Sequence, residues 1–148
     1  MSRSRVGRIT LSLMLTCVTW GCASQLSDNR PEKYVDPELQ VYLDEFKEAL
    51  SVHNLAPHHA IILLSYVDSF PPIEDKPGAR QVGVCIGVHV VHVLKGLDKK
   101  FERAVTWHEL GHCMMDLEHN DNPDSLMFPN VPYEITREIE TEFFGEMN

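Results

Sequence analysis

Apolar residues recur at helical spacing in three stretches of the chain, and each stretch predicts a helix. The first follows Asp36 and Pro37, a capping aspartate before a proline suited to the first helical turn, and it runs to about Asn54. The second covers residues 98–115 and the third covers residues 133–147. Steps of four and three along the second predict one inward-facing stripe: Phe101, Val105, His108, His112 and Met115.

Two other stretches have the composition of strands. Residues 60–67 are apolar and rich in branched side chains, which is typical of a buried strand. Residues 82–93 are also strand-like, and Gly83 and Gly87 indicate a bulge or a turn within them. The Pro and Gly content of residues 70–78 predicts a loop between the two.

These elements predict a small single α+β domain over residues 36–148, with a short twisted sheet and a C-terminal helix. The length of 148 residues fits one domain. His89 and His92 lie three positions apart on the second predicted strand, so their side chains should point to opposite faces of it. We interpret them as ordinary strand residues and not as a ligand pair.

The first residues have the pattern of a secretory signal. Arg3, Arg5 and Arg8 precede a short apolar run over residues 9–18, and small residues follow it. The run is shorter than the roughly 20 apolar residues of a membrane-spanning helix. We therefore expect residues 1–21 to direct export and then to be removed.

The junction of Gly21 and Cys22 resembles a bacterial lipoprotein signal, in which the cysteine is lipidated and becomes the first mature residue. The resemblance implies a lipidated tether over residues 22–35, attachment to the membrane through the lipid only, and a periplasm-facing outer-membrane or cell-surface location. The outer membrane is favoured because Ala23, and not Asp, follows the cysteine. The alternative is ordinary cleavage near Ala23 or Ser24, which would give a secreted chain.

The mature chain is strongly acidic. Removal of the three signal-peptide arginines leaves 10 Lys and Arg against 22 Asp and Glu, a net charge of about −12 with neutral histidines. Such a charge repels nucleic acid and gives no attraction to an anionic membrane surface.

Two cysteines remain after the signal, Cys85 and Cys113. An even pair in an exported chain predicts one disulfide between them. The alternative is a pair of buried free thiols.

A possible metal site begins at His108, where the sequence reads His-Glu-Leu-Gly-His. Residues i and i+4 of a helix lie on nearly the same face, so His108 and His112 are able to bind one zinc ion. Glu109 lies about 100° around the helix from His108, beside the ion but not aligned as a ligand. A carboxylate in that place is suited to act as a general base.

A third ligand must follow the helix. If the helix continued, His119 would lie about 10.5 Å along the axis from His112, whereas two nitrogen ligands of one zinc lie within about 4 Å. The helix must therefore end after His112 and the chain must fold back. No glycine lies between the two histidines, and Asp116 is the residue there best able to adopt the left-handed conformation of a helix end.

These residues, with Ser125-Leu-Met-Phe-Pro129, resemble the metzincin zinc metallopeptidases. In that family a glycine ends the helix, a third histidine ligand follows, and a methionine turn, matched here by Met127, lies below the zinc. The resemblance implies a monomeric endopeptidase with one zinc ion, three histidine ligands and a peptide or protein substrate. The chain departs from the family because the glycine is absent and Glu118 occupies the usual position of the third histidine, one residue before His119. We expect His119 to be the ligand, with Glu118 as the alternative.

Two rival functions remain open. In a thermolysin-like site the third ligand would be Glu138 or Glu142 of the last helix. In a non-catalytic lipoprotein the zinc would be structural and the domain would bind a partner. A structural zinc is usually held by four protein ligands, whereas only three are evident here. Glu109→Ala separates a catalytic site from the non-catalytic lipoprotein, because it should spare zinc and remove hydrolysis only if the site is catalytic.

The remaining polar segments give weaker expectations. The acidic run 118–124 does not have the spacing of a calcium-binding EF-hand, so we interpret it as a solvated loop. An extended peptide could pair with a sheet edge at residues 88–93. We assign no function to His53, His58 or His59.

Overall fold

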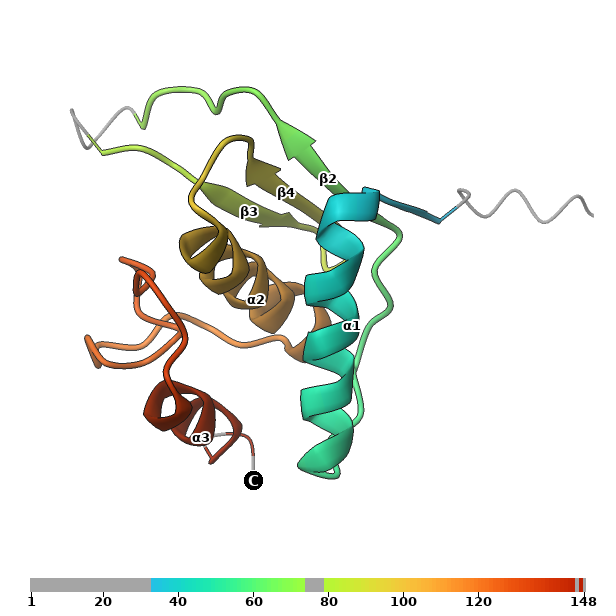
Figure 1. The fold of residues 1–148 in the computed structure, drawn as a ribbon, viewed down its shortest axis with the longest axis vertical. Helices are drawn as coiled ribbons and strands as arrows, with labels where there is room; N and C mark the ends of the chain where they lie inside the picture. The colour runs from blue at the N-terminus through green and yellow to red at the C-terminus, as the bar shows by residue number, and fades with distance from the viewer. Residues whose placement is uncertain (1–32, 74–78, 146, 148) are drawn as a thin grey trace, which may run out of the picture. The chain divides into compact units, whose positions relative to one another are not determined.

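The computed structural model describes residues 33–73, 79–145 and 147. Within them lies an α+β domain with a four-stranded mixed sheet and three helices, as predicted (Figure 1). The signal, Cys22 and most of the expected tether lie outside the described residues. The elements are β1 (Tyr34–Val35), α1 (Pro37–Val52), β2 (Leu63–Val67), β3 (Gly83–Ile86), β4 (Val90–Leu94), α2 (Lys99–Met115) and α3 (Arg137–Gly145).

The sheet begins within the segment that was expected to be a tether. Tyr34 and Val35 form β1 and pair in parallel with β2, so the domain starts two residues before the predicted boundary at Asp36. Asp36 then caps α1 as expected, because its carboxylate accepts a hydrogen bond from the backbone N–H of Glu38 at 3.1 Å. The buried residues of α1 are Leu39, Tyr42, Leu43, Phe46 and Leu50.

The segment 82–93 forms a hairpin and not one strand. β3 and β4 pair antiparallel, and Gly87 and Val88 between them both have positive φ, near 55° and 57°. This places His89 in the turn and His92 on β4, so the prediction that they share one strand is wrong. The strand order β1-β2-β4-β3 makes β3 the outer strand and β4 an inner one. The expected peptide-binding edge at residues 88–93 is therefore wrong for the β4 part of that segment, because β4 pairs with a strand on each side.

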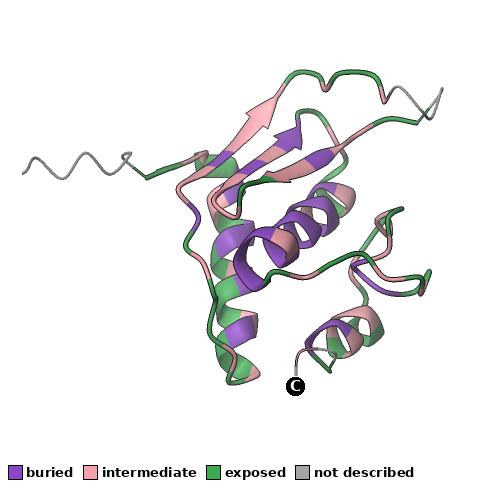
Figure 2. Cartoon of the chain, turned by 180° about the vertical axis from the view of Figure 1, so that it is seen from behind, coloured by how far each residue is buried: buried purple, intermediate pink, exposed green. Residues whose placement is uncertain are grey.

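The helices cover one face of the sheet. α2 packs against β3 and β4, and α1 packs against α2 (Figure 1). Val91 and Val93, two positions apart on β4, are fully buried and belong to the core cluster that includes residues of α1 and α2. Figure 2 shows that most of α2 is buried. Leu64 of β2 pairs with Val91 and belongs to the same core.

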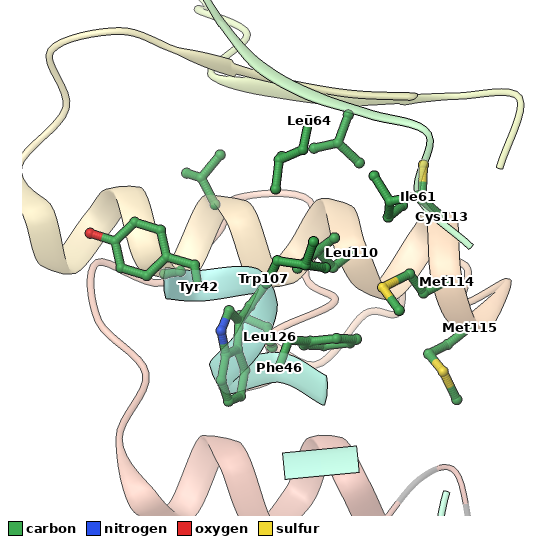
Figure 3. Close-up of a cluster of buried hydrophobic side chains, with 14 of the residues drawn as sticks. Tyr42, Phe46, Ile61, Leu64, Trp107, Leu110, Cys113, Met114, Met115 and Leu126 are labelled. Carbon is green, nitrogen blue, oxygen red and sulfur yellow. The ribbon is translucent and has the colours of Figure 1, made fainter. Parts of the chain in front are cut away.

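Aromatic side chains join α3 to the two longer helices. Phe46 of α1 lies edge-on to Trp107 of α2 (Figure 3), with ring centroids 5.4 Å apart. The ring centroid of Phe143 lies 6.0 Å from that of Phe46. Such aromatic pairs contribute about 0.5–1.5 kcal/mol each beyond their buried area.

α3 begins at Arg137 and not near residue 133, because Thr136 accepts a hydrogen bond from the N–H of Ile139 and serves as the cap.

Within the described part of the chain, no helix has the length and apolar composition needed to cross a membrane.

Candidate metal site

The site is built on the buried helix α2. Asp98 caps its first turn by accepting from the N–H of Lys100 at 3.0 Å. One inward face of the helix then carries His108 and Glu109, which are 3% and 6% exposed, and half-buried His112 one turn later. Burying a polar side chain costs free energy unless it is hydrogen-bonded. The contacts of these three side chains therefore indicate the function of this part of α2.

The helix ends at Asp116, which adopts the left-handed conformation with φ 57° and ψ 29°. This confirms the predicted pivot. The backbone N–H groups of Asp116 and Leu117 both donate to the carbonyl of Gly111, which satisfies one of the free carbonyls at the helix end. The chain reverses there and brings His119 back toward His108 and His112.

The three histidines meet at their Nε2 atoms. Each pair among His108, His112 and His119 has an Nε2–Nε2 distance of 3.1 Å. Two nitrogen ligands of one zinc lie within about 4 Å of each other, so these distances fit a single ion. Among the described residues, this is the group of three that could hold a metal ion. Glu118 does not belong to this group, so the structure brings His119, and not Glu118, to His108 and His112.

Backbone carbonyls fix the orientation of two of the imidazoles. Nδ1 of His108 donates to the carbonyl of Leu126 at 2.7 Å, and Nδ1 of His112 donates to the carbonyl of Leu117 at 2.5 Å. With the proton on Nδ1, the lone pair of Nε2 is free for a metal ion. Burial also lowers the pKa of His108 to about 4, so this imidazole is neutral near pH 7.

Glu109 lies against the edge strand β3. Its carboxylate accepts a hydrogen bond from the backbone N–H of Cys85, and burial raises the pKa of Glu109 to about 7. Gly83 makes this close approach possible. A Cβ atom at Gly83 would lie 2.7 Å from Oε1 of Glu109, far inside normal contact distance.

A cleft of about 460 Å³ contains the histidines and Glu109. β3 and the β3–β4 turn form one wall, and α2 with the segment that follows it forms the other. Glu109, Asp116 and Glu118 give the lining three carboxylates, and the described lining residues include no lysine or arginine. The charge of the lining therefore favours cationic groups over anionic ones.

Met127 packs directly on the helix that carries the ligands. It is 1% exposed, and its Sδ lies so near Gly111 that a Cβ atom there would be 2.9 Å away. Its backbone N–H donates to Oγ of Ser125 at 3.1 Å, and the preceding residue, Leu126, supplies the carbonyl for His108. The turn that contains Met127 thus orients one of the three candidate ligands.

A disulfide joins Cys85 of β3 to Cys113 of α2, with 5.6 Å between the Cα atoms. It ties the strand beside Glu109 to the residue that follows His112. The two walls of the cleft are therefore covalently linked.

The carboxylates of α3 do not complete the site. Glu142 accepts a short hydrogen bond from Nδ2 of Asn122. Neither Glu138 nor Glu142 belongs to the metal-binding group found among the described residues, so the thermolysin-like ligand set is not supported.

Two residues without an expected function do approach the site. The imidazoles of His58 and His59 contact the carboxylate of Asp116, which lines the cleft. They lie more than 50 positions from it in sequence, and no spacing pattern connects them to the metal ligands.

No protein-family model matches the sequence, and neither the curated proteins nor the solved structures contain a significant match.

Proposed function

We propose that the protein is a zinc-dependent endopeptidase, exported and held at a membrane by a lipid on Cys22. The observation that carries the proposal is the meeting of three Nε2 atoms at 3.1 Å beside the buried carboxylate of Glu109. A structural zinc site would usually offer a fourth protein ligand. Here three histidines share an open cleft with a general base, which favours catalysis.

Zinc is the metal that best suits this donor set. Neutral imidazoles bind it well, and catalytic zinc sites commonly keep three protein ligands and one open position. When bound, zinc supplies Lewis-acid chemistry, which polarises a peptide carbonyl and lowers the pKa of water to about 7. His108, His112 and His119 would hold it, with the first two oriented by backbone carbonyls.

Glu109 is assigned the role of proton carrier. With a pKa raised to about 7 by burial, its carboxylate is suited to accept a proton from the attacking water and to pass it to the departing amine. The hydrogen bond from the N–H of Cys85 and the contact with Gly83 hold this side chain in one place. Precise placement matters because a shift of about 1 Å in a catalytic group costs roughly 10²-fold in rate.

The outer strand β3 is the surface on which we expect a peptide substrate to bind. It pairs with β4 on one side, and no strand of the described sheet pairs with its other side. Gly83, Val84 and Cys85 all line the cleft. An extended peptide could therefore add to the sheet here, with its scissile bond near the histidines.

Three variants test the metal ligands and the base separately. Glu109→Ala should retain zinc and lose hydrolysis of a peptide library, whereas His119→Ala should lose zinc. Glu118→Ala is the matched control and should retain zinc. Equal cleavage by wild type and Glu109→Ala would refute the mechanism. Zinc binding with no hydrolysis by the wild type would point instead to the non-catalytic partner-binding lipoprotein.

The lipid attachment has an independent test. Intact-mass analysis of protein extracted from membranes should show a chain that starts at Cys22 and carries acyl groups. A soluble chain that starts after Ala23 or Ser24 would contradict lipidation and leave export intact.

A further inference from the structure

The loop that contains His58 and His59 contacts the C-terminal end of α2, although it lies far from the proposed metal ligands in sequence. Nδ1 of His58 lies 3.2 Å from a carboxylate oxygen of Asp116, and Nε2 of His59 lies 2.9 and 3.0 Å from the two oxygens. The backbone N–H groups of His58 and His59 also donate to the carbonyl of Met114, at 2.8 and 3.2 Å. The loop therefore binds both the last turn of the helix and the residue that ends it.

Asp116 occupies a conformation that needs support. The left-handed region costs a non-glycine residue roughly 1–2 kcal/mol, and aspartate tolerates it best when its side chain finds hydrogen bonds. Partial desolvation acts to raise the pKa of Asp116, but hydrogen bonds from His58 and His59 outweigh it and hold the pKa below the ordinary value. The carboxylate is thus an ionised acceptor for both imidazoles at neutral pH.

The turn at Asp116 controls two of the three ligands. The carbonyl of the next residue, Leu117, accepts from Nδ1 of His112 at 2.5 Å. Two residues later, Nε2 of His119 lies 3.1 Å from the other two imidazoles. A backbone rotation at Asp116 would move an orienting carbonyl and a ligand together.

We propose that His58 and His59 are positioning residues for the metal site. By holding the carboxylate of Asp116, they fix the left-handed turn that carries His119 back to the other ligands. This inference rests on the proposed metal site and adds two residues that do not touch the ion. The two imidazoles and the carboxylate do not form a metal-binding group of their own among the described residues, which favours a clamp over a second site.

A double-mutant cycle with Asp116→Gly separates this role from general support of the loop. Glycine adopts the left-handed turn without strain and has no carboxylate to hold. We expect His58→Gln/His59→Gln to weaken zinc binding about 10-fold in the wild-type background, the size typical of lost residues behind metal ligands. In the Asp116→Gly background the same double substitution should leave the zinc dissociation constant unchanged. Asp116→Asn keeps the turn but only one of the two acceptor oxygens, so it should weaken zinc binding by less than His58→Gln/His59→Gln does.

The measurement is chelator competition for zinc, with the absorption spectrum of the cobalt-substituted protein as a second readout. The cobalt spectrum should change in His58→Gln/His59→Gln and should not change further when Asp116→Gly is already present. His58 and His59 side chains are 57% and 32% exposed, so their replacement should leave the fold intact. His58→Gln and His59→Gln alone give a second test. Each should weaken zinc binding in the wild-type background and have no effect in the Asp116→Gly background.

Two results would overturn the inference. One is an unchanged zinc dissociation constant in His58→Gln/His59→Gln, and the other is equal weakening in the wild-type and Asp116→Gly backgrounds. The variant His119→Ala shows whether the clamp alone is wrong or whether the proposed metal site is wrong as well. If His119→Ala weakens zinc binding and the histidine pair does not, only the clamp is wrong, whereas unchanged binding in His119→Ala removes the three-histidine site itself.

Discussion

The substitution Gly83→Ala would place one methyl group between the edge strand β3 and the side chain of Glu109. A Cβ atom there lies 2.7 Å from Oε1 of Glu109, 2.8 Å from Cγ of Glu109 and 2.7 Å from Cγ1 of Val105. Carbon atoms in contact lie about 3.5–4.0 Å apart, so the overlap is roughly 1 Å. β3 is fastened to α2 by the disulfide of Cys85, which limits how far the strand can move away.

The overlap is expected to displace the Glu109 side chain and to destabilise the domain. Overpacking of this kind costs about 1–3 kcal/mol of unfolding free energy. A displacement near 1 Å of the catalytic carboxylate should lower kcat/KM about 10²-fold. The zinc dissociation constant should not change, because the methyl group overlaps none of the metal ligands among its three nearest contacts.

Thermal unfolding, zinc titration and peptide hydrolysis measure the three effects. Gly145→Ala is the matched control, since a Cβ atom there meets no atom of the described residues within 4 Å. In the Glu109→Ala background two of the three close contacts disappear, so Gly83→Ala should cost less stability there than in the wild type. Wild-type hydrolysis by Gly83→Ala, or equal destabilisation in both backgrounds, would refute the reasoning.

Three further outcomes follow from the site. Cys85→Ser/Cys113→Ser should lose about 3.6 kcal/mol of unfolding free energy by the loop-entropy estimate for a separation of 28 residues, measured by urea denaturation. Zinc at about 100 times its dissociation constant should raise the free energy of unfolding by about 2.7 kcal/mol relative to the zinc-free protein. In His119→Ala, thermal melts with and without zinc should not differ. Glu118→Lys, on the rim of the cleft, should shift kcat/KM away from peptides with cationic side chains by up to about fivefold, since an exposed charge pair contributes about 0.2–1 kcal/mol. An unchanged ratio for paired lysine and glutamate peptides would contradict that charge bias.

The local geometry of the metal site could be predicted from the sequence. Helical spacing places His108 and His112 on one face, and the rise per residue requires the chain to break before His119. In the absence of glycine, the conformational preference of aspartate selects Asp116 as the turn. Each of these steps depends only on neighbours within about one or two helical turns.

The long-range part of the site could not be predicted in the same way. Nothing in residues 82–93 identifies Val88 as left-handed, because a branched residue rarely adopts that conformation, and without the turn the outer strand is misplaced. The contacts of His58 and His59 with Asp116 depend on how α1 ends and where its following loop lies. Periodicity carries no information about such contacts.

The ligands and the base differ in how much of the chain must be folded to assemble them. The span from His108 to His119 is 12 residues, so closing it costs little chain entropy. Glu109, in contrast, depends on β3, which reaches it only when the hairpin and its disulfide are formed. Opening of the sheet edge would separate the base from its surroundings and leave the ligand segment continuous. If the proposed function is correct, activity should therefore be lost before metal binding when the sheet edge opens.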